Sequence, residues 1–263
     1  MTGAAIPRPR LPGERAGAFA TLRAAGLRLV SRVMEHGGCL VCRTHWRGEG
    51  WEPALAESAK GSIILAANHA SLLDTPMIRH VLPAALERRL FTVGGYDFFE
   101  PRGSGWARLR ARVVLRFIVD SYRVWMIDRR VEGAAAVAEL TGLLTRERVM
   151  LLYPEGTRSR TGRMGRVQPG VAIIAARSGA PVIPVHISGS HRVLPPGVRW
   201  PQPGAVVVRA GAPLRPAPQE RPEAFALRVA AAIQALGDSA GPAAPRRERE
   251  ARSARVEAGA EAP

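Results

Sequence analysis

Short apolar runs recur along the chain, and each ends at polar or glycine residues before a stretch with helical periodicity begins. Runs of this length fit inner β-strands and are too short for buried helices. Strands that alternate with helices predict an α/β domain built on a central, mostly parallel or mixed sheet flanked by helices. The predicted strands cover residues 40–46, 62–67, 90–94, 124–127, 149–153, 180–187 and 206–208.

The predicted helices fill the intervals between these strands, except that a Gly-rich turn and a loop are expected between residues 47 and 61. Gly237 follows the last helix and is expected to end it. Pro184 lies inside a predicted strand, which indicates an edge strand or a bend, because proline donates no hydrogen bond to a neighbouring strand. The predicted helices begin at residue 76 or cover residues 106–118, 131–146, 170–178 and 222–236.

A chain of 263 residues can bury one substantial core with polar ends left over. Residues 37–237 are therefore predicted to form one domain. Residues 1–15 interleave proline with arginine and are expected to be a disordered basic arm, and residues 238–263 a disordered tail. Residues 16–36 predict an amphipathic helical element rich in arginine, which fits packing on the domain as well as membrane contact.

The formal net charge is +16 and rests almost wholly on arginine, because Lys60 is the only lysine. Such a balance favours anionic partners, and nucleic acid, anionic lipid, coenzyme A and acidic carrier proteins all qualify. No stretch approaches the roughly 20 uninterrupted apolar residues of a membrane-spanning helix, and no secretory signal is recognisable. We therefore expect a cytoplasmic protein that lies peripherally on the inner face of the cell membrane.

Cys39 and Cys42 form a Cys-x-x-Cys pair flanked by His36 and His45, which raises the question of a zinc site. Both cysteines lie in an apolar context, and the second, distant pair of a zinc finger or ribbon is missing. We expect two unpaired thiols in a reducing compartment and no metal.

Residues 68–74, Asn-His-Ala-Ser-Leu-Leu-Asp, follow an apolar run and bring a histidine close to a carboxylate. Thr75 is a suitable N-cap and Pro76 a suitable first helical residue, so His69 and Asp74 are expected in the turn before a helix. A carboxylate bonded to one imidazole nitrogen selects the tautomer and leaves the other nitrogen free to accept a proton. The pair is predicted to be a general base and its orienting group, although a purely structural turn has the same pattern.

Three further blocks follow the histidine block. Residues 127–129 read Ile-Asp-Arg, residues 153–159 read Tyr-Pro-Glu-Gly-Thr-Arg-Ser, and residues 182–185 read Val-Ile-Pro-Val. In this order and at these spacings the four blocks resemble the glycerolipid acyltransferases, the family of 1-acylglycerol-3-phosphate (lysophosphatidate) acyltransferases with a His-x4-Asp motif. The resemblance covers residues 40–215. It implies that residues 37–237 are an acyltransferase domain with an α/β fold.

The resemblance also implies a role for each block. His69 and Asp74 would be catalytic, and Arg129 would help to hold the phosphate of the acceptor. Two features depart from the family pattern. Family members commonly have a lysine soon after the strand predicted here at residues 90–94, but residues 94–99 contain none. The glycine that usually precedes the aspartate corresponding to Asp128 is also absent. The last block would line the acyl-donor side of the site, although a core strand explains it equally well; its residues are Val182, Ile183 and Pro184.

Residues 153–159 also have the composition of a phosphate-binding loop. They offer a glycine that allows close backbone approach, a hydroxyl and a guanidinium. Glu155 would either pair with an arginine or bond a hydroxyl of the acceptor. Arginines in the loop that follows would meet the phosphates of coenzyme A or an acidic carrier protein, or form a solvated surface. The predicted substrate-binding residues are Glu155, Gly156, Thr157 and Arg158, and the loop arginines are Arg160, Arg163 and Arg166.

These features predict an enzyme that moves a fatty acyl group from acyl-CoA or acyl-carrier protein to the free hydroxyl of 1-acylglycerol-3-phosphate, giving phosphatidic acid. His69 would take the hydroxyl proton and Asp74 would orient His69, so that the oxygen attacks the thioester without a covalent acyl-enzyme. No cofactor and no nucleic acid are expected, since the thioester is a co-substrate. Two alternatives stay open: the same chemistry on another acceptor, such as a lysophospholipid or glycolipid, and a non-catalytic basic protein that binds membrane or nucleic acid.

Residues 106–118 show the clearest helical period of the chain, with an apolar stripe beside a basic one. An aromatic and aliphatic stripe flanked by arginines fits a helix in the lipid interface. It fits a helix that covers the sheet equally well, and the family resemblance adds a role in shaping a tunnel for the acyl chain. The apolar stripe contains Trp106, Leu109, Val113 and Phe117, and the basic stripe contains Arg108, Arg112 and Arg116.

Overall fold

The computed structural model describes residues 42–95, 105–127, 133–144, 147–198 and 200–238, together with Pro9, Leu11 and isolated positions between 26 and 40. The predicted basic arm, most of the N-terminal helical element and nearly all of the predicted tail therefore lie outside the described residues. So do Cys39, Asp128 and Arg129.

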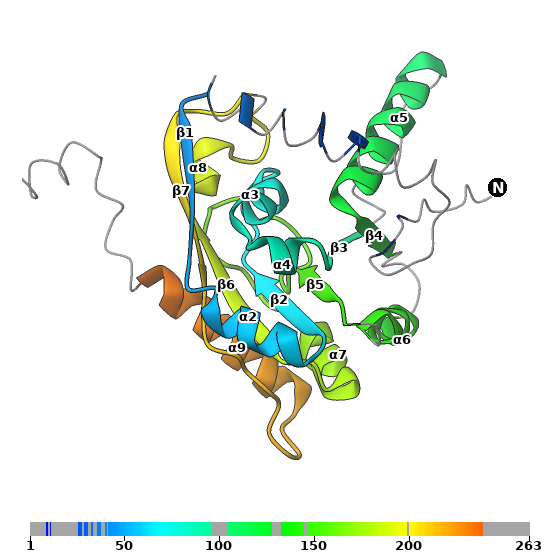
Figure 1. Ribbon diagram of the computed structural model, residues 1–263, viewed down its shortest axis with the longest axis vertical. Coiled ribbons are helices and arrows are strands. Elements are labelled where there is room, and N and C mark those ends of the chain that lie inside the picture. Colours follow the sequence, from blue (N-terminus) through cyan, green and yellow to red (C-terminus); the bar gives the residue numbers. More distant parts are fainter. Residues whose placement is uncertain are drawn as a thin grey trace, which may run out of the picture.

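Seven strands of the described residues form one sheet with the order β1-β7-β6-β2-β5-β3-β4 (Figure 1). Neighbouring strands pair in parallel except β6 and β7, which are antiparallel, so β1 and β7 run opposite to the others. The sheet is mixed and mostly parallel, as predicted. The strands are β1 (Thr44–Glu49), β2 (Ile63–Ala67), β3 (Leu90–Gly95), β4 (Val124–Ile127), β5 (Val149–Leu152), β6 (Val182–Ser188) and β7 (Gly204–Ala210).

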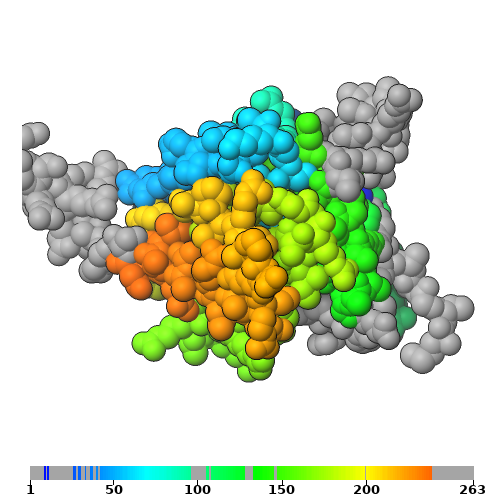
Figure 2. Space-filling model, turned by 90° about the horizontal axis from the view of Figure 1, so that it is seen from below, coloured from blue at the N-terminus to red at the C-terminus, as the bar shows by residue number. Residues whose placement is uncertain are grey.

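Helices cover both faces of the sheet. One core cluster joins the sheet to α2, α3 and α4, and the other joins it to α6, α7 and α9. Figure 2 shows α9 beside α7 on the second face. No helix in the described part of the chain is both long and apolar enough to cross a membrane. The helices are α2 (Glu52–Lys60), α3 (Asp74–Val81), α4 (Ala84–Glu87), α5 (Gly105–Tyr122), α6 (Gly133–Leu143), α7 (Gly170–Ser178), α8 (Ser190–Val193) and α9 (Pro222–Asp238).

β2 lies near the centre of the sheet, between β6 and β5, and all of its side chains are buried. Successive residues of a strand point to opposite faces. Ile63 and Leu65 accordingly pack in one core cluster, and Ile64 and Ala66 pack in the other. Burial on both faces explains the uninterrupted apolar run, and the carboxyl end of β2 leads directly into residues 68–74.

The region around β1 differs from the prediction. β1 covers Thr44–Glu49 rather than residues 40–46, and the predicted loop contains α2. β1 pairs along its whole length with β7, a partner that the local sequence does not reveal. Gly48 lies inside β1, opposite Val208, rather than in a turn. A Cβ at this position would lie 2.6 Å from Nε1 of Trp51 and 2.9 Å from Cβ of Val81. Close packing therefore requires glycine here.

Pro184 lies in an inner strand, since β6 has β2 on one side and β7 on the other. The expectation of an edge strand is therefore wrong. Around Pro184 the antiparallel register of β6 with β7 and the residues after it shifts by one position. Val182 lies opposite Leu214, whereas Val185 lies opposite Ala210. A shift of this kind is a β-bulge, where a missing amide donor is tolerated.

Two helix ends also differ from the prediction. α3 begins at Asp74, and Leu73 at its N-cap position makes no side-chain capping bond, so Thr75 is not the cap. α9 continues through Gly237, the predicted stop. A Cβ on Gly237 would lie 2.6 Å from Nε2 of His186. This glycine allows the helix to approach β6 and does not end it.

Candidate active site

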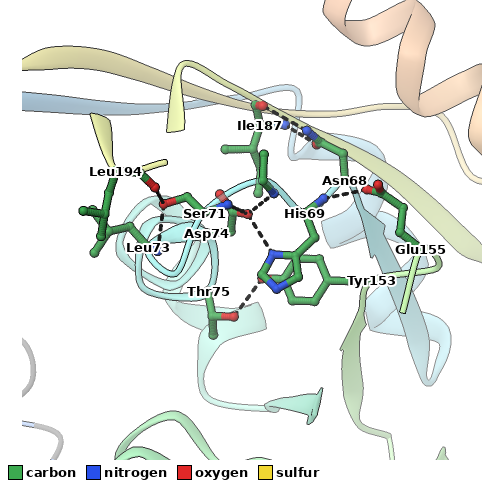
Figure 3. A network of polar contacts seen from close by, with 11 residues as sticks. Asn68, His69, Ser71, Leu73, Asp74, Thr75, Tyr153, Glu155, Ile187 and Leu194 are labelled. Carbon is green, nitrogen blue, oxygen red and sulfur yellow. Dashed lines mark hydrogen bonds and ion pairs between the residues drawn. The ribbon is translucent and has the colours of Figure 1, made fainter. Parts of the chain in front are cut away.

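The turn after β2 positions His69 beside Asp74 (Figure 3). Nδ1 of His69 lies 2.8 Å from Oδ2 of Asp74, and Nε2 makes no hydrogen bond within the described residues. The imidazole is 19% exposed, whereas the carboxylate is fully buried. A buried carboxylate at one ring nitrogen and an open second nitrogen form the geometry of an oriented base. The structure therefore brings the two predicted residues together.

Backbone amides also hold the carboxylate of Asp74. Its Oδ2 accepts hydrogen bonds from the amides of Ala70, at 2.7 Å, and Ser71, at 2.8 Å. Asp74 is the first residue of α3, where the helix dipole favours negative charge. Oδ1 is buried and has no hydrogen-bond partner in the described part of the chain. The hydrogen bonds to this carboxylate therefore converge on the oxygen that faces His69.

Tyr153, the residue after β5, stacks on the imidazole of His69. The ring centroids are 3.9 Å apart and the planes differ by 15°. The hydroxyls of Tyr153 and Thr75 are 2.7 Å apart, which links the end of β5 to α3. Burial, with the nearby negative charge of Asp74, raises the pKa of Tyr153 well above its ordinary value, so the phenol stays neutral. Thr75 thus anchors the stacked ring instead of capping a helix.

Glu155 joins the histidine turn to the loop after β5. Its Oε1 accepts a hydrogen bond from the amide of His69 at 2.8 Å, and its Oε2 accepts one from the amide of Gly165 at 2.7 Å. The amide of Ser159 donates to the carbonyl of His69 at 2.7 Å. The carboxylate is buried, and these bonds engage both of its oxygens with backbone rather than with an arginine. Glu155 therefore positions the loop beside the histidine.

Asn68 and Ser71 attach the turn to β6 and α8. The side-chain amide of Asn68 donates to the carbonyl of Ile187 at 3.1 Å and accepts from its backbone amide at 2.7 Å. The hydroxyl of Ser71 donates to the carbonyl of Leu194 at 2.8 Å and accepts from the amide of Leu73 at 3.2 Å. Ser71 is fully buried. Its hydroxyl serves the turn, as expected, and is not presented as a nucleophile.

A pocket of about 390 Å³ opens beside His69. It lies between α3, α5 and the carboxyl ends of β3, β4 and β5, and its size is in the usual range for small-molecule sites. Gly156, Thr157 and Arg158 share its lining with His69, so these predicted positions meet around one cavity. The rest of the lining is largely apolar and includes Leu72, Val93, Ile118, Val124, Ile127 and Leu152.

Arginines continue along the loop beyond Arg158. Arg160, Arg163 and Arg166 are exposed and, like Arg158, have no ion pair within the described residues. Nε2 of His191 lies 3.1 Å from the carbonyl of Arg160, so this loop lies next to α8. Only Arg158 of these four arginines lines the pocket. The predicted positive charge is present, and one arginine of the group belongs to the pocket lining.

The residues predicted for the acyl-donor side do not meet at the pocket. Val182, Ile183 and Pro184 are buried in β6, and none of them belongs to the pocket lining. Val182 and Ile183 lie in the two opposite core clusters, which is the core-strand interpretation of this block. Arg129 lies outside the described residues, so its contact with the acceptor stays a prediction.

Sequence reasoning missed several parts of the site. The stacking of Tyr153 on His69 could not be predicted, because the two residues are far apart in the chain. Gly94 was predicted only as a strand end, yet it lines the pocket, and a Cβ there would lie 2.7 Å from Cγ1 of Val124. The Gly-Gly pair at the end of an apolar run was the available signal. Tyr122 of α5 also lines the pocket, beyond the end of the predicted helix.

The described residues contain no group of three or more His, Cys, Asp or Glu side chains placed to hold a metal ion. Cys42 is a free thiol. Cys39, the other cysteine of the Cys-x-x-Cys pair, lies outside the described residues.

Residues 51–188 match the model of the Acyltransferase family. This match spans 138 of the 263 residues and includes the histidine turn, the loop of Glu155 and β6.

Relatives among curated proteins share parts of the chain. The 1-acyl-sn-glycerol-3-phosphate acyltransferase of Cocos nucifera is 23% identical over 163 residues, which are 61% of this chain and 48% of that protein. The chloroplastic 1-acyl-sn-glycerol-3-phosphate acyltransferase BAT2 of Brassica napus is 42% identical over 48 residues, 18% of this chain and 14% of that protein. The chain thus spans less than half the length of the curated relatives that it matches.

A solved structure has the same fold. The 1-acyl-sn-glycerophosphate (LPA) acyltransferase PlsC from Thermotoga maritima matches with a TM-score of 0.59 and 21% sequence identity. The match covers 85% of this chain and 88% of that chain. The likeness extends over the mixed sheet and the helices on both of its faces.

Proposed function

The chain belongs to the Acyltransferase family, and from this premise we propose that it transfers a fatty acyl group from an acyl thioester to the free hydroxyl of 1-acylglycerol-3-phosphate. The names of the matched relatives support this acceptor. The observation that supports the proposal most is the shared lining of one pocket: His69, oriented by Asp74, lies there with Arg158 and a largely apolar surface. A base, an anion-binding group and room for an acyl chain are the three requirements of the reaction.

In the proposed reaction His69 acts through Nε2. This nitrogen accepts the proton of the acceptor hydroxyl, while Nδ1–H donates to Asp74, which selects the tautomer and stabilises the imidazolium. The hydroxyl oxygen forms a C–O bond with the thioester carbonyl carbon, the C–S bond breaks, and the leaving thiolate takes the proton from His69. Base catalysis of this kind contributes about 10²–10⁴-fold, and the rest comes from holding both substrates in register.

The two substrates would use different parts of the lining. Thr157 and Arg158 fit the phosphate of the acceptor, since a guanidinium keeps its charge and offers two parallel donors. Gly156, at φ 69°, bends the loop in a way that favours glycine and brings backbone close to the bound anion. The apolar part of the pocket would receive an acyl chain. The thioester would be supplied by coenzyme A or by an acyl-carrier protein.

Replacement of the base tests the proposal. His69→Gln keeps similar volume but removes the proton acceptor, so thiol release from a long-chain acyl-CoA in the presence of 1-acylglycerol-3-phosphate should fall by about 10²-fold or more. His191→Gln, at a half-buried histidine outside the pocket lining, is the matched control and should keep the parental rate. Circular dichroism would establish that both variants are folded. An His69→Gln enzyme as fast as the parent would refute the mechanism.

The acceptor is tested with a panel. The parent protein would be given one acyl-CoA and a series of acceptors: 1-acylglycerol-3-phosphate, lysophospholipids with other head groups, and glycolipids. The proposal expects the free phosphate to give the highest kcat/KM. A higher kcat/KM with another acceptor would mean that the reaction is acyl transfer but that 1-acylglycerol-3-phosphate is not the preferred acceptor. No thioester consumption with any acceptor would favour the non-catalytic alternative.

A further inference from the structure

α5 has two apolar faces, and the domain covers only one of them. Towards its carboxyl end, inward-facing side chains pack with β4: Leu115, Ile118, Val119 and Tyr122. The stripe of Trp106, Leu109, Val113 and Phe117 is centred about 175° away around the helix, at about 100° per residue. The two faces therefore point in roughly opposite directions, and the stripe is not the surface that packs on the sheet.

The stripe is open to solvent along the amino-terminal part of α5. Trp106 is 84% exposed, Leu109 50% and Val113 61%. Figure 1 shows this part of the helix extending beyond the sheet. Single exposed apolar residues are common on protein surfaces, but a contiguous row of large ones on a single helix marks a contact surface. The exposures exclude the interpretation in which the stripe covers the sheet.

Unpaired positive charge accompanies this row. Arg108, Arg110 and Arg112 are exposed and have no ion pair within the described residues. The acidic residue of α5, Asp120, pairs with Arg116. A helix with tryptophan and aliphatic side chains, interleaved with arginines that pair with no acid of the described residues, complements an anionic lipid surface. The long arginine side chains can lie along the apolar surface while their charged ends reach the phosphates.

The same helix reaches the reaction pocket, because Ile118 and Tyr122 from its inward face belong to the pocket lining. We propose that the amino-terminal part of α5 docks on an anionic membrane, with Trp106, Leu109 and Val113 in the boundary of the acyl chains. Docking there places one end of the helix in the bilayer that holds a lipid acceptor and the other end beside His69. The link to the acceptor rests on the proposed function; the docking itself does not.

Vesicle co-sedimentation of the full chain tests the docking. The vesicles would contain phosphatidylcholine alone or phosphatidylcholine with phosphatidylglycerol. One variant carries Trp106→Ser, Leu109→Ser and Val113→Ser, and a second carries Arg108→Gln, Arg110→Gln and Arg112→Gln. Because all six positions are exposed, the variants should fold, which thermal melts would verify. A control variant, with Trp200→Ser and Leu227→Ser, removes large exposed apolar side chains from other elements.

The parent and the control should bind vesicles with phosphatidylglycerol equally well. The arginine variant should bind them on the order of 100-fold more weakly, about fivefold for each charge removed. The apolar variant should lose about tenfold or more. Undiminished binding by the apolar variant would overturn the proposal, whether the arginine variant binds or not. So would absence of binding by the parent, or a parent that dimerises through α5 without binding vesicles.

Activity separates this proposal from the proposed function. Both α5 variants should lose transfer to an acceptor embedded in vesicles more than transfer to the same acceptor dispersed in detergent. If the parent transfers no acyl group in either form, the proposed function fails while the sedimentation result stands. If transfer proceeds and the α5 variants sediment like the parent, the docking proposal fails alone.

Discussion

Tyr153 and His69 form a stacked pair whose two rings have separate anchors. Asp74 holds the imidazole through Nδ1, and Thr75 holds the phenol through its hydroxyl. A ring lying flat on the imidazole limits its rotation and so keeps Nε2 directed away from Asp74. Aromatic pairs contribute about 0.5–1.5 kcal/mol beyond burial. Tyr153 is therefore a positioning residue for the proposed base.

Two substitutions of Tyr153 separate the stack from the hydroxyl. Tyr153→Phe keeps the ring and loses the bond to Thr75, worth about 1 kcal/mol, so kcat should fall by about fivefold or less. Tyr153→Leu removes the stack, and kcat should fall by about tenfold or more, with a smaller change in KM. Steady-state kinetics across pH would check both, since a displaced base also moves the pH profile of kcat. Equal losses in the two variants would assign the effect to the hydroxyl.

Arg158 is predicted to bind the phosphate of the acceptor. Charge-assisted hydrogen bonds contribute about 1.5–3 kcal/mol, so Arg158→Gln should raise KM for 1-acylglycerol-3-phosphate by about 10- to 100-fold. An acceptor without a free phosphate should be affected much less. Arg177→Gln, on the exposed face of α7, is the matched control and should leave KM unchanged. The same loss for both kinds of acceptor would show that Arg158 does not bind the phosphate.

The packing of β1 against Trp51 and Val81 depends on a glycine, Gly48, which has no side chain. A Cβ on Gly48 would meet Nε1 of Trp51 at 2.6 Å and Cβ of Val81 at 2.9 Å, so Gly48→Ala should destabilise the fold by about 1–3 kcal/mol. Gly142, in α6, is exposed and has open space around it. Gly142→Ala should stabilise the fold by about 0.5–1 kcal/mol. Urea unfolding of both variants measures the opposite signs; a neutral Gly48→Ala would mean that β1 can move away.

The elements that were predicted correctly from the sequence are those whose local composition is sufficient to identify them. β2 and β5 are buried on both faces, so their apolar runs identified them without knowledge of their partners. His69 and Asp74 are close in the chain, and a single turn suffices to bring them together. The helical period of residues 106–118 likewise identified α5 before its neighbours were known.

The parts that could not be predicted depend on partners far along the chain. β1 has no strong strand composition and is defined by β7. Glu155 was expected to meet an arginine or a substrate hydroxyl, yet it binds backbone amides on either side of it, one of them 86 positions away at His69. Pattern analysis shows which residue types occur at a site. It does not show which of them engage each other across the fold.

For the whole molecule, His186 gives stability a pH dependence. It lies half-buried on β6, with Nδ1 3.0 Å from the hydroxyl of Ser188. Burial and then the charge of Arg209 lower its pKa, against a weaker opposite effect of Asp238. The unfolded chain therefore binds this proton more readily than the folded chain. The resulting stability is present above the ordinary pKa of about 6.5 and is lost as the pH falls towards the lowered folded value.

His186→Gln removes this titration. Between the two pKa values the parent should lose up to about 1.4 kcal/mol of unfolding free energy per pH unit more than the variant. Urea unfolding of both proteins at a series of pH values from neutral to mildly acidic measures the difference. Parallel curves for the two proteins would show that His186 does not carry the effect.

The bonds that shape the histidine turn also govern when it can form during synthesis. Asn68 needs the backbone of Ile187, 119 positions later, and Ser71 needs that of Leu194, 123 positions later. Contacts of such separation form after local ones, and a growing chain folds from its amino-terminal side. Residues 68–74 thus leave the ribosome well before their partners exist. A nascent chain that stops before Leu194 therefore carries His69 and Asp74 without the bond from Ser71 that attaches their turn to the rest of the fold.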